Sequence, residues 1–506
     1  MIRRALLVPA AVLVLFALLM ASCRREEQKV SPATFPSAPV ILISVDTLRA
    51  DHLPAYGYRK VDTPNIDLLR KDSVLFRNAY AHVPLTLPSH ATVLSGLLPP
   101  ENGVRDNIGY RFDGSKHASI PSFLKQQGYA TGAAVSSYVL RSASGLGSLF
   151  DFYDDHFDAS TDGSAGNLQR AGSQTSAVAE RWIDEQGRAP FFFFLHLFEP
   201  HSPYDPPEPF RSRFALPYDG EIAAADAVLG EFIQHLKDRE IYDRAIVIFI
   251  SDHGEDLYEH GEPEHGIFLY RDVLHVPLLV KLPGGRRAGE TIDRSSGLVD
   301  IFPSICALTG FPPPERLSGR NFLGPATTAE GPRTIYAETF YPRIHLGWSE
   351  LRSLIGERFH LISAPTPELY DLAADPAEKK NITSEERRQF AIMKEDLGQY
   401  GALLQSPLQA DPEDEKKLAA LGYIGSRQKS DTGPLPDPKE HVGEIAPMLQ
   451  SMRMLDLGRI PEAIAGLRAI VKRNPGYTDA WSQLGRALET VGDYEDAVTA
   501  YETAVR

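Results

Sequence analysis

The sequence predicts an α/β fold followed by a helical C-terminal module. Apolar runs alternate with helix-like stretches along most of the chain, which is the pattern of an α/β sheet. These runs are continuously apolar, as expected for strands that are covered on both faces. Near the C-terminus the sequence repeats with a period of about 34 residues, which is typical of paired helices that stack on one another. The clearest expected strands are residues 40–45, 130–135, 191–198, 245–251 and 276–282.

The length and charge describe a folded protein that is not suited to binding nucleic acid. A chain of 506 residues is long enough for one large core and an appended module. The formal net charge of −15 argues against a nucleic-acid-binding protein, which would carry a basic surface. Because Cys23 and Cys306 are the two cysteines, no disulfide framework is expected, and Cys306 lies in an apolar run typical of a buried residue.

Residues 1–23 have the pattern of a secretory signal. Two arginines precede an apolar run, and the small residues of MASC follow, ending at Cys23. MASC resembles a bacterial lipoprotein box, which predicts export to the bacterial cell envelope and a lipid anchor on Cys23. A plain membrane anchor and a signal cleaved without lipidation are the alternatives, although the apolar run is short for a membrane span. Residues 24–38 are polar and contain proline, and we expect them to form a tether.

The composition changes again after residue 405. Residues 406–443 are polar, charged and proline-bearing, as expected for a linker. In residues 444–506 the recurring positions are Gly458 and Gly492, Ala463 and Ala497, Leu467 and Tyr501, together with Trp481, Leu484 and Gly485 at the start of the second unit. This pattern resembles the tetratricopeptide repeat, with one repeat and an incomplete second one, and it implies a protein partner. The alternative is a chance helical hairpin.

Side chains that can bind a metal follow three of the expected strands. Asp46 follows the first of them, and Asp252 and His253 follow the fourth. His201 lies shortly after the third. Because ligands bind at the carboxyl ends of strands in open α/β sheets, we expect these side chains to converge. A single aspartate there is more often a helix cap, but Asp, His and Gly together at a strand end are typical of a metal site.

The segment TLPSHATVLSG, residues 86–96, combines a hydroxyl group with an expected helix start. Ser89 is expected to cap a helix that Gly96 ends. Thr86 would then lie just before the helix N-terminus, where free N–H groups and the helix dipole favour an anion. A divalent cation would lower the pKa of its hydroxyl and make it a nucleophile. The alternative is that Thr86 is an ordinary turn residue.

Seven segments of the chain occur in an order that indicates one family. They are residues 41–58, 63–82, 86–99, 196–207, 251–284, 298–310 and 368–382. Among their motifs are ILISVDTLRADHLPAYGY, TLPSHATVLSGLLP and SDHGEDLYEHGEPEHG. Together they resemble the sulfatase branch of the alkaline phosphatase superfamily across residues 39–405. The resemblance implies an alkaline-phosphatase-like mixed sheet sandwiched by helices, with a divalent metal at its catalytic centre.

The departures from the typical sulfatase pattern fall on residues that serve sulfate chemistry. Typical sulfatases carry a cysteine, sometimes a serine, that is oxidised to formylglycine, and Thr86 occupies that position. Oxidation of threonine would give a ketone rather than the aldehyde that this chemistry needs. His90 replaces an arginine, and Thr47 replaces a second aspartate. Residues 132–137 lack the expected lysine and histidine, and the expected lysine after Gly266 is also missing.

Thr86 instead resembles the nucleophile of the phosphodiesterase and phospho-transferase members of the superfamily. The resemblance implies one site for a divalent metal, Mn, Zn, Ca or Mg, held by Asp46, Thr86, Asp252 and His253. His201 would protonate the leaving group or bind the ester oxygen.

The remaining histidines have less definite roles. His265 is a candidate second contact to an anion or a metal. His90 lies one turn from Thr86, on the expected substrate side. A second metal could be held by Glu199, His201 and His265. We interpret the other candidates as ordinary surface or core histidines, namely His82, His260 and His275.

The sequence therefore predicts an exported, metal-dependent hydrolase that cleaves phosphate monoesters or diesters, or sulfate esters, with Thr86 as nucleophile. The alternatives are a phospho-transferase acting on envelope polymers, a formylglycine-independent sulfatase, and an inactive scaffold that presents the repeats. Residues that can bind a metal, expected to lie near Thr86, favour the enzyme over the inactive scaffold. The expected partners are the ester substrate, a protein bound by the repeats, and the membrane through Cys23.

Overall fold

The structure is a computed structural model that describes residues 34–157, 169–324, 333–401 and 434–505. The expected signal with Cys23, the tether up to residue 33 and the linker up to residue 433 lie outside the described residues. Among the helices that are described, none is long and apolar enough to span a bilayer.

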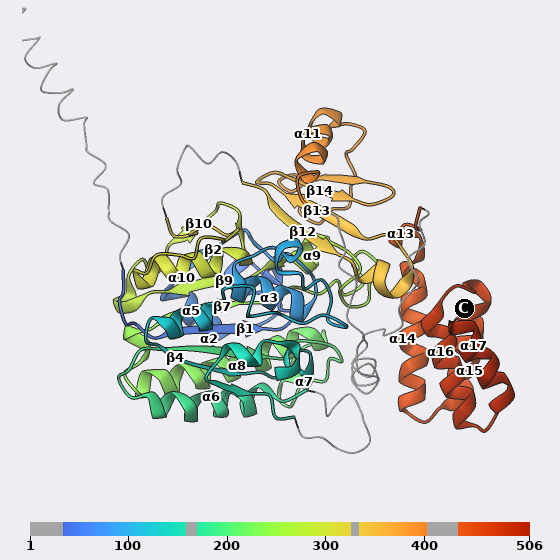
Figure 1. Ribbon diagram of the computed structural model, residues 1–506, viewed down its shortest axis with the longest axis horizontal. Coiled ribbons are helices and arrows are strands. Elements are labelled where there is room, and N and C mark those ends of the chain that lie inside the picture. Colours follow the sequence, from blue (N-terminus) through green and yellow to red (C-terminus); the bar gives the residue numbers. More distant parts are fainter. Residues whose placement is uncertain (1–33, 158–168, 325–332, 402–433, 506) are drawn as a thin grey trace, which may run out of the picture.

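An eight-stranded mixed sheet forms the centre of the molecule (Figure 1). Its strand order is β10-β2-β9-β7-β1-β6-β4-β5, and the strands from β7 to β5 are parallel. β9 runs antiparallel to both β7 and β2, which makes the sheet mixed. The strands are β1 (Val40–Val45), β2 (Ser73–Phe76), β4 (Ala130–Ala134), β5 (Phe152–Asp154), β6 (Phe191–Leu197), β7 (Ile246–Ile250), β9 (Leu278–Lys281) and β10 (Thr291–Ile292).

The strands expected from the sequence are present, with one interruption. The first four correspond to β1, β4, β6 and β7. The fifth, residues 276–282, is divided, because β8 (His275–Val276) pairs with β3 (Ala79–Tyr80) in a separate sheet that also contains β11 (Ser296–Gly297). The chain then joins the main sheet as β9. Pro277 lies at the break, and a proline cannot donate a hydrogen bond to a strand ladder.

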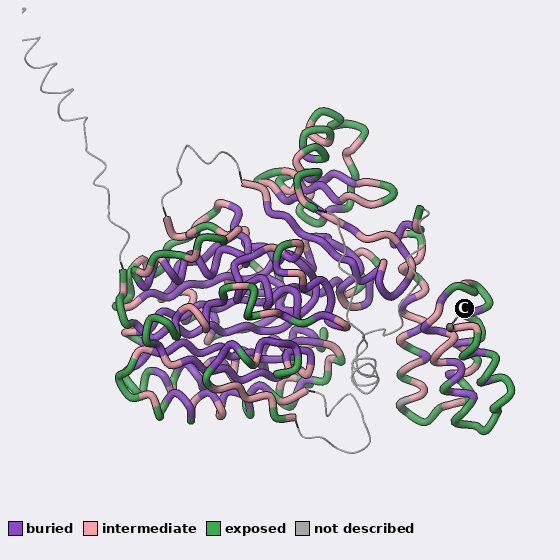
Figure 2. Tube along the Cα trace, in the orientation of Figure 1, coloured by how far each residue is buried: buried purple, intermediate pink, exposed green. Residues whose placement is uncertain are grey.

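Helices cover both faces of the main sheet, as its continuously apolar strands predict. Along β1, Ile41 and Ile43 are buried in one core, whereas Val40 and Leu42 are buried in the other. Figure 2 shows these strands buried between the helical layers. The first core is covered by α2 (Pro64–Lys71), α6 (Gly172–Gln186) and α8 (Pro217–Asp238), and the second by α3 (Thr86–Ser95), α5 (Ile120–Gln126) and α10 (Ile301–Thr309).

A four-stranded antiparallel sheet follows the main sheet in the sequence. Its strands are β12 (Ile335–Thr339), β13 (Leu351–Ile355), β14 (Phe359–Ser363) and β15 (Glu368–Asp371), with α11 (Arg387–Leu397) packed against β13 and β14. Three short helices complete the domain: α4 (Pro99–Asn102), α7 (Phe210–Arg213) and α9 (Arg271–Leu274).

A buried ion pair joins this second sheet to the main domain. The guanidinium of Arg105 donates to both carboxylate oxygens of Glu338 on β12, with 2.8 Å between Nη2 and Oε2. The Tyr336 hydroxyl donates to the same Oε2 at 2.5 Å. Both charged side chains are 1% exposed, so each depends on the other for its counter-charge.

The C-terminal residues are helical, and successive helices from α14 to α17 contact one another. A Cβ on Gly485 would come within 2.8 Å of the Tyr501 ring, so a glycine there permits the close packing of α16 on α17. α16 also contacts the π-helical turn Pro342–Leu346, and the Trp348 ring stacks on His441. The helices are α13 (Pro438–His441), α14 (Ile445–Asp456), α15 (Ile460–Arg473), α16 (Thr478–Thr490) and α17 (Tyr494–Val505).

Replacing Arg105 with methionine is expected to destabilise the protein by about 3–5 kcal/mol, because Glu338 would stay buried without its counter-charge. Urea-induced unfolding followed by tryptophan fluorescence measures the change. The double variant Arg105→Met, Glu338→Leu should recover most of the loss, since apolar residues can replace a buried pair. A single variant as stable as the wild type would contradict this role of the pair.

Candidate active site

Parallel pairing of β1 and β7 brings two carboxylates to the same edge of the main sheet. Asp46 follows β1, and Asp252 and His253 follow β7. His253 Nε2 lies 3.8 Å from Asp46 Oδ1 and 3.5 Å from Asp252 Oδ2. All three side chains are fully buried, and their ligand-type atoms lie within 4.8 Å of one another. The predicted convergence of these residues is therefore present in the structure.

Thr86 is the first residue of α3 and lies beside Asp252. His90 Nδ1 is 2.7 Å from the Thr86 carbonyl oxygen and 3.6 Å from Asp252 Oδ2. The predicted capping by Ser89 is wrong, because the helix begins three residues earlier and the Ser89 hydroxyl donates to Asp252 O at 2.7 Å. That bond fixes α3 to the loop that carries Asp252 and His253. Gly96 ends the helix as expected, in the left-handed conformation.

The start of α3 does not offer the row of free N–H groups that the sequence predicts. The Leu87 N–H donates to Asn107 Oδ1 at 2.8 Å, and Pro88 has no N–H. The Ser89 N–H donates to Leu85 O at 3.1 Å. The helix dipole still favours an anion near Thr86, but binding one requires other donors or a cation.

Several buried polar atoms of the site have no hydrogen-bond partner among the described residues. They are both carboxylate oxygens of Asp46, Thr86 Oγ, Asp252 Oδ2 and His253 Nε2. His253 Nδ1 lies 3.0 Å from Gly254 O, so Nδ1 carries the ring proton and Nε2 presents a lone pair. Buried acceptors without donors are costly. Carboxylate, hydroxyl and imidazole atoms of this kind can coordinate a divalent cation, so the group fits one such ion.

Burial also shifts the protonation of these groups. It raises the pKa of Asp46 to about 7 and that of Asp252 to about 7, with the second carboxylate adding to the rise at Asp252. Burial lowers the pKa of His253 to about 4, so its ring is neutral at neutral pH. Near neutral pH the two carboxyl groups are therefore partly protonated, and a bound cation would displace these protons.

Two buried histidines support this group from the core side. His90 Nε2 lies 3.0 Å from Ser44 Oγ, so both of its ring nitrogens have partners. His196 Nε2, on β6, lies 3.4 Å from Asp46 Oδ2. The sequence analysis missed His196, although a lone histidine in the apolar run FFFFLHLF was an available signal. The two bonds of His90 favour a positioning role for its ring. Neither ring nitrogen of His196 has a hydrogen-bond partner among the described residues, and His90, His196 and Asp252 form a second group whose atoms could hold a metal ion.

His201, His265 and His253 form a row of imidazoles along the site. The ring centroids are 5.1 Å apart between His201 and His265, and 4.4 Å apart between His265 and His253. His265 Nδ1 lies 2.9 Å from Glu255 Oε1, and His201 Nδ1 lies 2.6 Å from Ser202 O. Burial lowers the pKa of His265 to about 3 and lowers the pKa of His201 well below its usual value. Both rings are therefore neutral at neutral pH.

Glu199 precedes His201 by two residues, and its Oε2 is buried without a hydrogen-bond partner among the described residues. Its Oε1 accepts the Gly172 N–H at 2.9 Å. In the part of the chain that the structure describes, no three-residue metal-type cluster combines Glu199 with His201 and His265. The geometry thus gives no support to a second metal at that position.

Thr47 is a second residue whose role the sequence analysis did not identify. Its φ of 54° is left-handed, which is unusual for a β-branched residue. Its N–H donates to Asp252 Oδ1 at 3.3 Å, and its carbonyl accepts the Tyr218 hydroxyl at 2.6 Å. The Thr47 hydroxyl is buried without a partner. Backbone strain held by the surrounding bonds is typical of functional sites.

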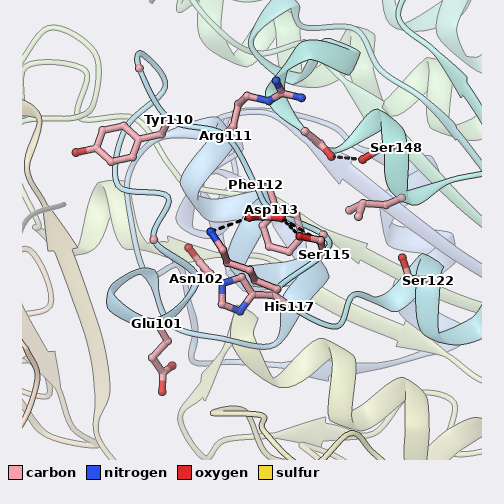
Figure 3. A pocket seen from close by; sticks show the side chains of 16 residues that line it. Glu101, Asn102, Tyr110, Arg111, Phe112, Asp113, Ser115, His117, Ser122 and Ser148 are labelled. Carbon is pink, nitrogen blue, oxygen red and sulfur yellow. Dashed lines mark hydrogen bonds and ion pairs between the residues drawn. The ribbon is translucent and has the colours of Figure 1, made fainter. Parts of the chain in front are cut away.

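A cavity of about 720 Å³ lies away from these residues (Figure 3). None of the candidate site residues lines this cavity. Its Asp113 carboxylate is bonded to Ser115 at 2.6 Å and to Lys116 at 2.9 Å, so the charges are paired within the cavity. The volume of this cavity alone does not identify it as the reaction centre.

The chain resembles known sulfatases over most of the catalytic domain. The sulfatase family profile matches residues 39–311, and the profile named N-sulphoglucosamine sulphohydrolase, C-terminal, matches residues 259–400. Arylsulfatase K of Xenopus laevis is 24% identical over 437 residues, covering 69% of this chain and 80% of its own. N-acetylgalactosamine-6-O-sulfatase of Bacteroides thetaiotaomicron is 22% identical over 486 residues, covering 72% and 94%.

Solved structures share the fold. The phosphonate monoester hydrolase of Agrobacterium radiobacter aligns with a TM-score of 0.59 at 23% identity, covering 72% of this chain and 96% of its own. A chain solved in complex with its substrate D-glucosamine-2-N,6-O-disulfate aligns with a TM-score of 0.61 at 19% identity, covering 72% and 98%. Because the sulfatase profile spans more than half of the chain, the protein belongs to the sulfatase family and is an ester hydrolase of that family.

Proposed function

We propose that the protein is a metal-dependent hydrolase of phosphate esters, with Thr86 as its nucleophile. The observation that carries this proposal is the Thr86 hydroxyl, which is buried without a hydrogen-bond partner among the described residues. The Thr86 backbone carbonyl and the Asp252 carboxylate both approach His90 Nδ1, at 2.7 and 3.6 Å. A structural threonine that is fully buried would ordinarily be hydrogen-bonded. The neighbouring unpartnered atoms of Asp46 and His253 supply the rest of a ligand set.

The residues present fit one divalent cation, Mn, Zn, Ca or Mg. Asp46, Thr86, Asp252 and His253 would hold it. When bound there, the cation lowers the pKa of the Thr86 hydroxyl and neutralises charge on the ester. The protein contributes two carboxylates and an imidazole whose orientation Gly254 O fixes.

In the proposed reaction the Thr86 hydroxyl loses its proton to solvent, and its oxygen attacks phosphorus as the bond to the leaving oxygen breaks. The proton lost by Thr86 is taken up through solvent by His201, whose protonated form the anionic ester favours, and His201 donates it to the leaving oxygen. Water then cleaves the Thr86–phosphoryl bond, His201 accepts the proton of the water, and that proton returns through solvent to the Thr86 oxygen. An alcohol in place of water would make the protein a transferase.

One feature favours phosphate over sulfate esters, and a second favours a phosphodiester over a phosphomonoester. A secondary alcohol such as Thr86 cannot be oxidised to the aldehyde on which formylglycine sulfatases depend. The site also presents neutral imidazoles of His201 and His265 rather than lysines, which suits a singly charged phosphodiester better than a doubly charged monoester. Sulfate esters are the second candidate substrate class, because the similar proteins include an N-acetylgalactosamine-6-O-sulfatase.

The flanking segments complete the proposal. We infer export to the cell envelope with a lipid anchor on Cys23, from the N-terminal sequence pattern. The four contacting C-terminal helices and the close approach at Gly485 support interpreting residues 444–506 as tetratricopeptide repeats that bind a protein partner.

The variant Thr86→Val keeps the shape of the side chain and removes the hydroxyl. We expect kcat on an aryl phosphodiester to fall by about 10³-fold or more, since the covalent step is lost. Aryl phosphodiester, phosphomonoester and sulfate substrates with one common leaving group are compared by steady-state kinetics. The wild type is expected to prefer the phosphodiester.

Two controls accompany this measurement. Thr86→Ser retains a hydroxyl and should keep measurable turnover. Thr92→Val changes a threonine of the same helix that bonds to Pro88 O at 3.0 Å, outside the site, and should leave kcat unchanged. Wild-type turnover by Thr86→Val would rule out Thr86 as nucleophile. A clear preference for the sulfate ester would favour the formylglycine-independent sulfatase.

Binding of Mn²⁺ is expected to weaken as pH falls from about 7 to about 5, by up to roughly tenfold per pH unit for each proton displaced. The pKa of Asp46 and that of Asp252 are each raised to about 7, so below that pH both carboxyls hold protons that must leave when the metal binds. His253, with a pKa of about 4, stays neutral over this range.

Isothermal titration calorimetry in buffers of different ionisation enthalpy measures both the affinity and the protons released. An affinity that is constant over this range, with no proton release, would show that the carboxylates are not the ligands.

A further inference from the structure

A third group of metal-type side chains lies outside the candidate active site. Asp256 and His260 belong to the loop that follows β7, and Asp272 belongs to α9. Their ligand atoms all lie within 4.8 Å of one another. His260 Nδ1 is 2.8 Å from Asp272 Oδ2 and 3.8 Å from Asp256 Oδ2. The chain reversal between the loop and α9 thus brings two carboxylates to one imidazole nitrogen.

The orientation of His260 directs Nδ1 towards these carboxylates, within hydrogen-bond distance of Asp272 Oδ2. Its Nε2 lies 3.2 Å from Ala377 O, and a carbonyl oxygen can only accept, so Nε2 carries a proton. In the neutral ring Nδ1 is then an acceptor. The ring is held in place by stacking on Tyr270, with 3.7 Å between centroids. Histidines that bind metals usually donate their other N–H to a carbonyl or carboxylate in this way.

Each carboxylate uses one oxygen in backbone hydrogen bonds and directs the other to this centre. Asp256 Oδ1 accepts the His260 N–H at 2.9 Å, and Asp272 Oδ1 accepts the Val273 N–H at 2.8 Å. Asp256 Oδ2 has no hydrogen-bond partner among the residues that the structure describes, and the side chain is 0% exposed. An unpartnered buried carboxylate oxygen beside two further acceptors calls for a cation.

We propose that Asp256, His260 and Asp272 bind a divalent transition-metal ion of the zinc class, at a site separate from the catalytic centre. One imidazole with two carboxylates is a ligand set that zinc accepts, and the imidazole disfavours calcium and magnesium. Three protein ligands leave the fourth tetrahedral position for water. A cavity of about 250 Å³ is lined by two of the three residues, His260 and Asp272, with Arg49, Glu259, Arg271 and Glu378 among its other residues.

The charge of Arg49, which lines the same cavity, is offset by two carboxylates. Arg49 is paired with Asp51 at 2.8 Å and with Glu259 at 3.1 Å, which offsets its charge. The competing arrangement is a doubly protonated His260 bridging the two carboxylates without any metal. The two arrangements differ in one observable, the number of metal ions that the folded chain holds.

The ion would hold in place the loop that carries Glu255, which contacts a histidine of the active site. Glu255, which holds His265 Nδ1 at 2.9 Å, directly precedes Asp256. Joining Asp256 to Asp272 would therefore fix this loop against α9. The inference stands on its own ligands and does not depend on the phosphate-ester reaction.

The first test counts zinc ions on the full-length chain. The protein is stripped with a chelator, loaded with Zn²⁺, dialysed, and analysed by mass spectrometry of the elements. We expect Asp256→Asn to hold about one zinc ion fewer per chain than the wild type. Asp293→Asn changes an exposed carboxylate that pairs with Arg77, outside the ligand set and its cavity, and should match the wild type. Asp252→Asn should lose the catalytic ion and keep this one, which separates the two proposals.

The second test needs no variant and so does not depend on any variant folding. Wild-type crystals soaked in Zn²⁺ are measured at the zinc absorption edge. An anomalous peak within bonding distance of Asp256, His260 and Asp272 is expected. Absence of a peak at that position, or equal zinc content in Asp256→Asn and the wild type, would overturn the proposal and favour the protonated His260.

Discussion

Two parallel strands end in buried carboxylates with oxygens that have no hydrogen-bond donor among the described residues, and the surrounding elements are organised around this edge of the sheet. β1 and β7 are central and covered on both faces, so Asp46 and Asp252 leave them directly inside the core. Two carboxylates in such a place repel each other and lose hydration. His196, His253 and His90 surround them, but their own pKa values are lowered by burial, so they supply little positive charge. The uncompensated negative charge therefore favours binding of a cation at the carboxyl edge of the sheet.

The elements around this edge fix its geometry through a small number of bonds. Ser89 ties α3 to the backbone of Asp252, and Asn107 holds the Leu87 N–H at the start of that helix. The next contact outward is the 3.1 Å pair between Asp106 and His345, in the π-helical turn that α16 contacts. Beside it, Arg105 pairs with Glu338 on the second sheet. The second sheet and the C-terminal helices are therefore connected by contacts to the helix that carries Thr86.

The sequence predicts the main strands and the convergence of Asp46, Asp252 and His253, because continuous apolar runs and strand-end positions are local signals. It does not predict features that depend on long-range contacts. The hydroxyl of Ser89 bonds to a distant carbonyl instead of capping its helix, and the strain at Thr47 exists only because surrounding groups hold it. The metal-type cluster at His260 was also missed, since only folding places Asp272 against it, and the ring was interpreted as an ordinary polar histidine.

We propose that Thr86 attacks phosphorus as the encoded residue, without oxidative maturation. Rapid quenching of the metal-loaded enzyme with an aryl phosphodiester, followed by peptide mass spectrometry, identifies the residue that attacks. We expect an unmodified threonine at position 86 before reaction and a phosphoryl adduct on that side chain during turnover. An oxidised residue 86 in the active protein, or an adduct on a different side chain with Thr86 unmodified, would contradict it.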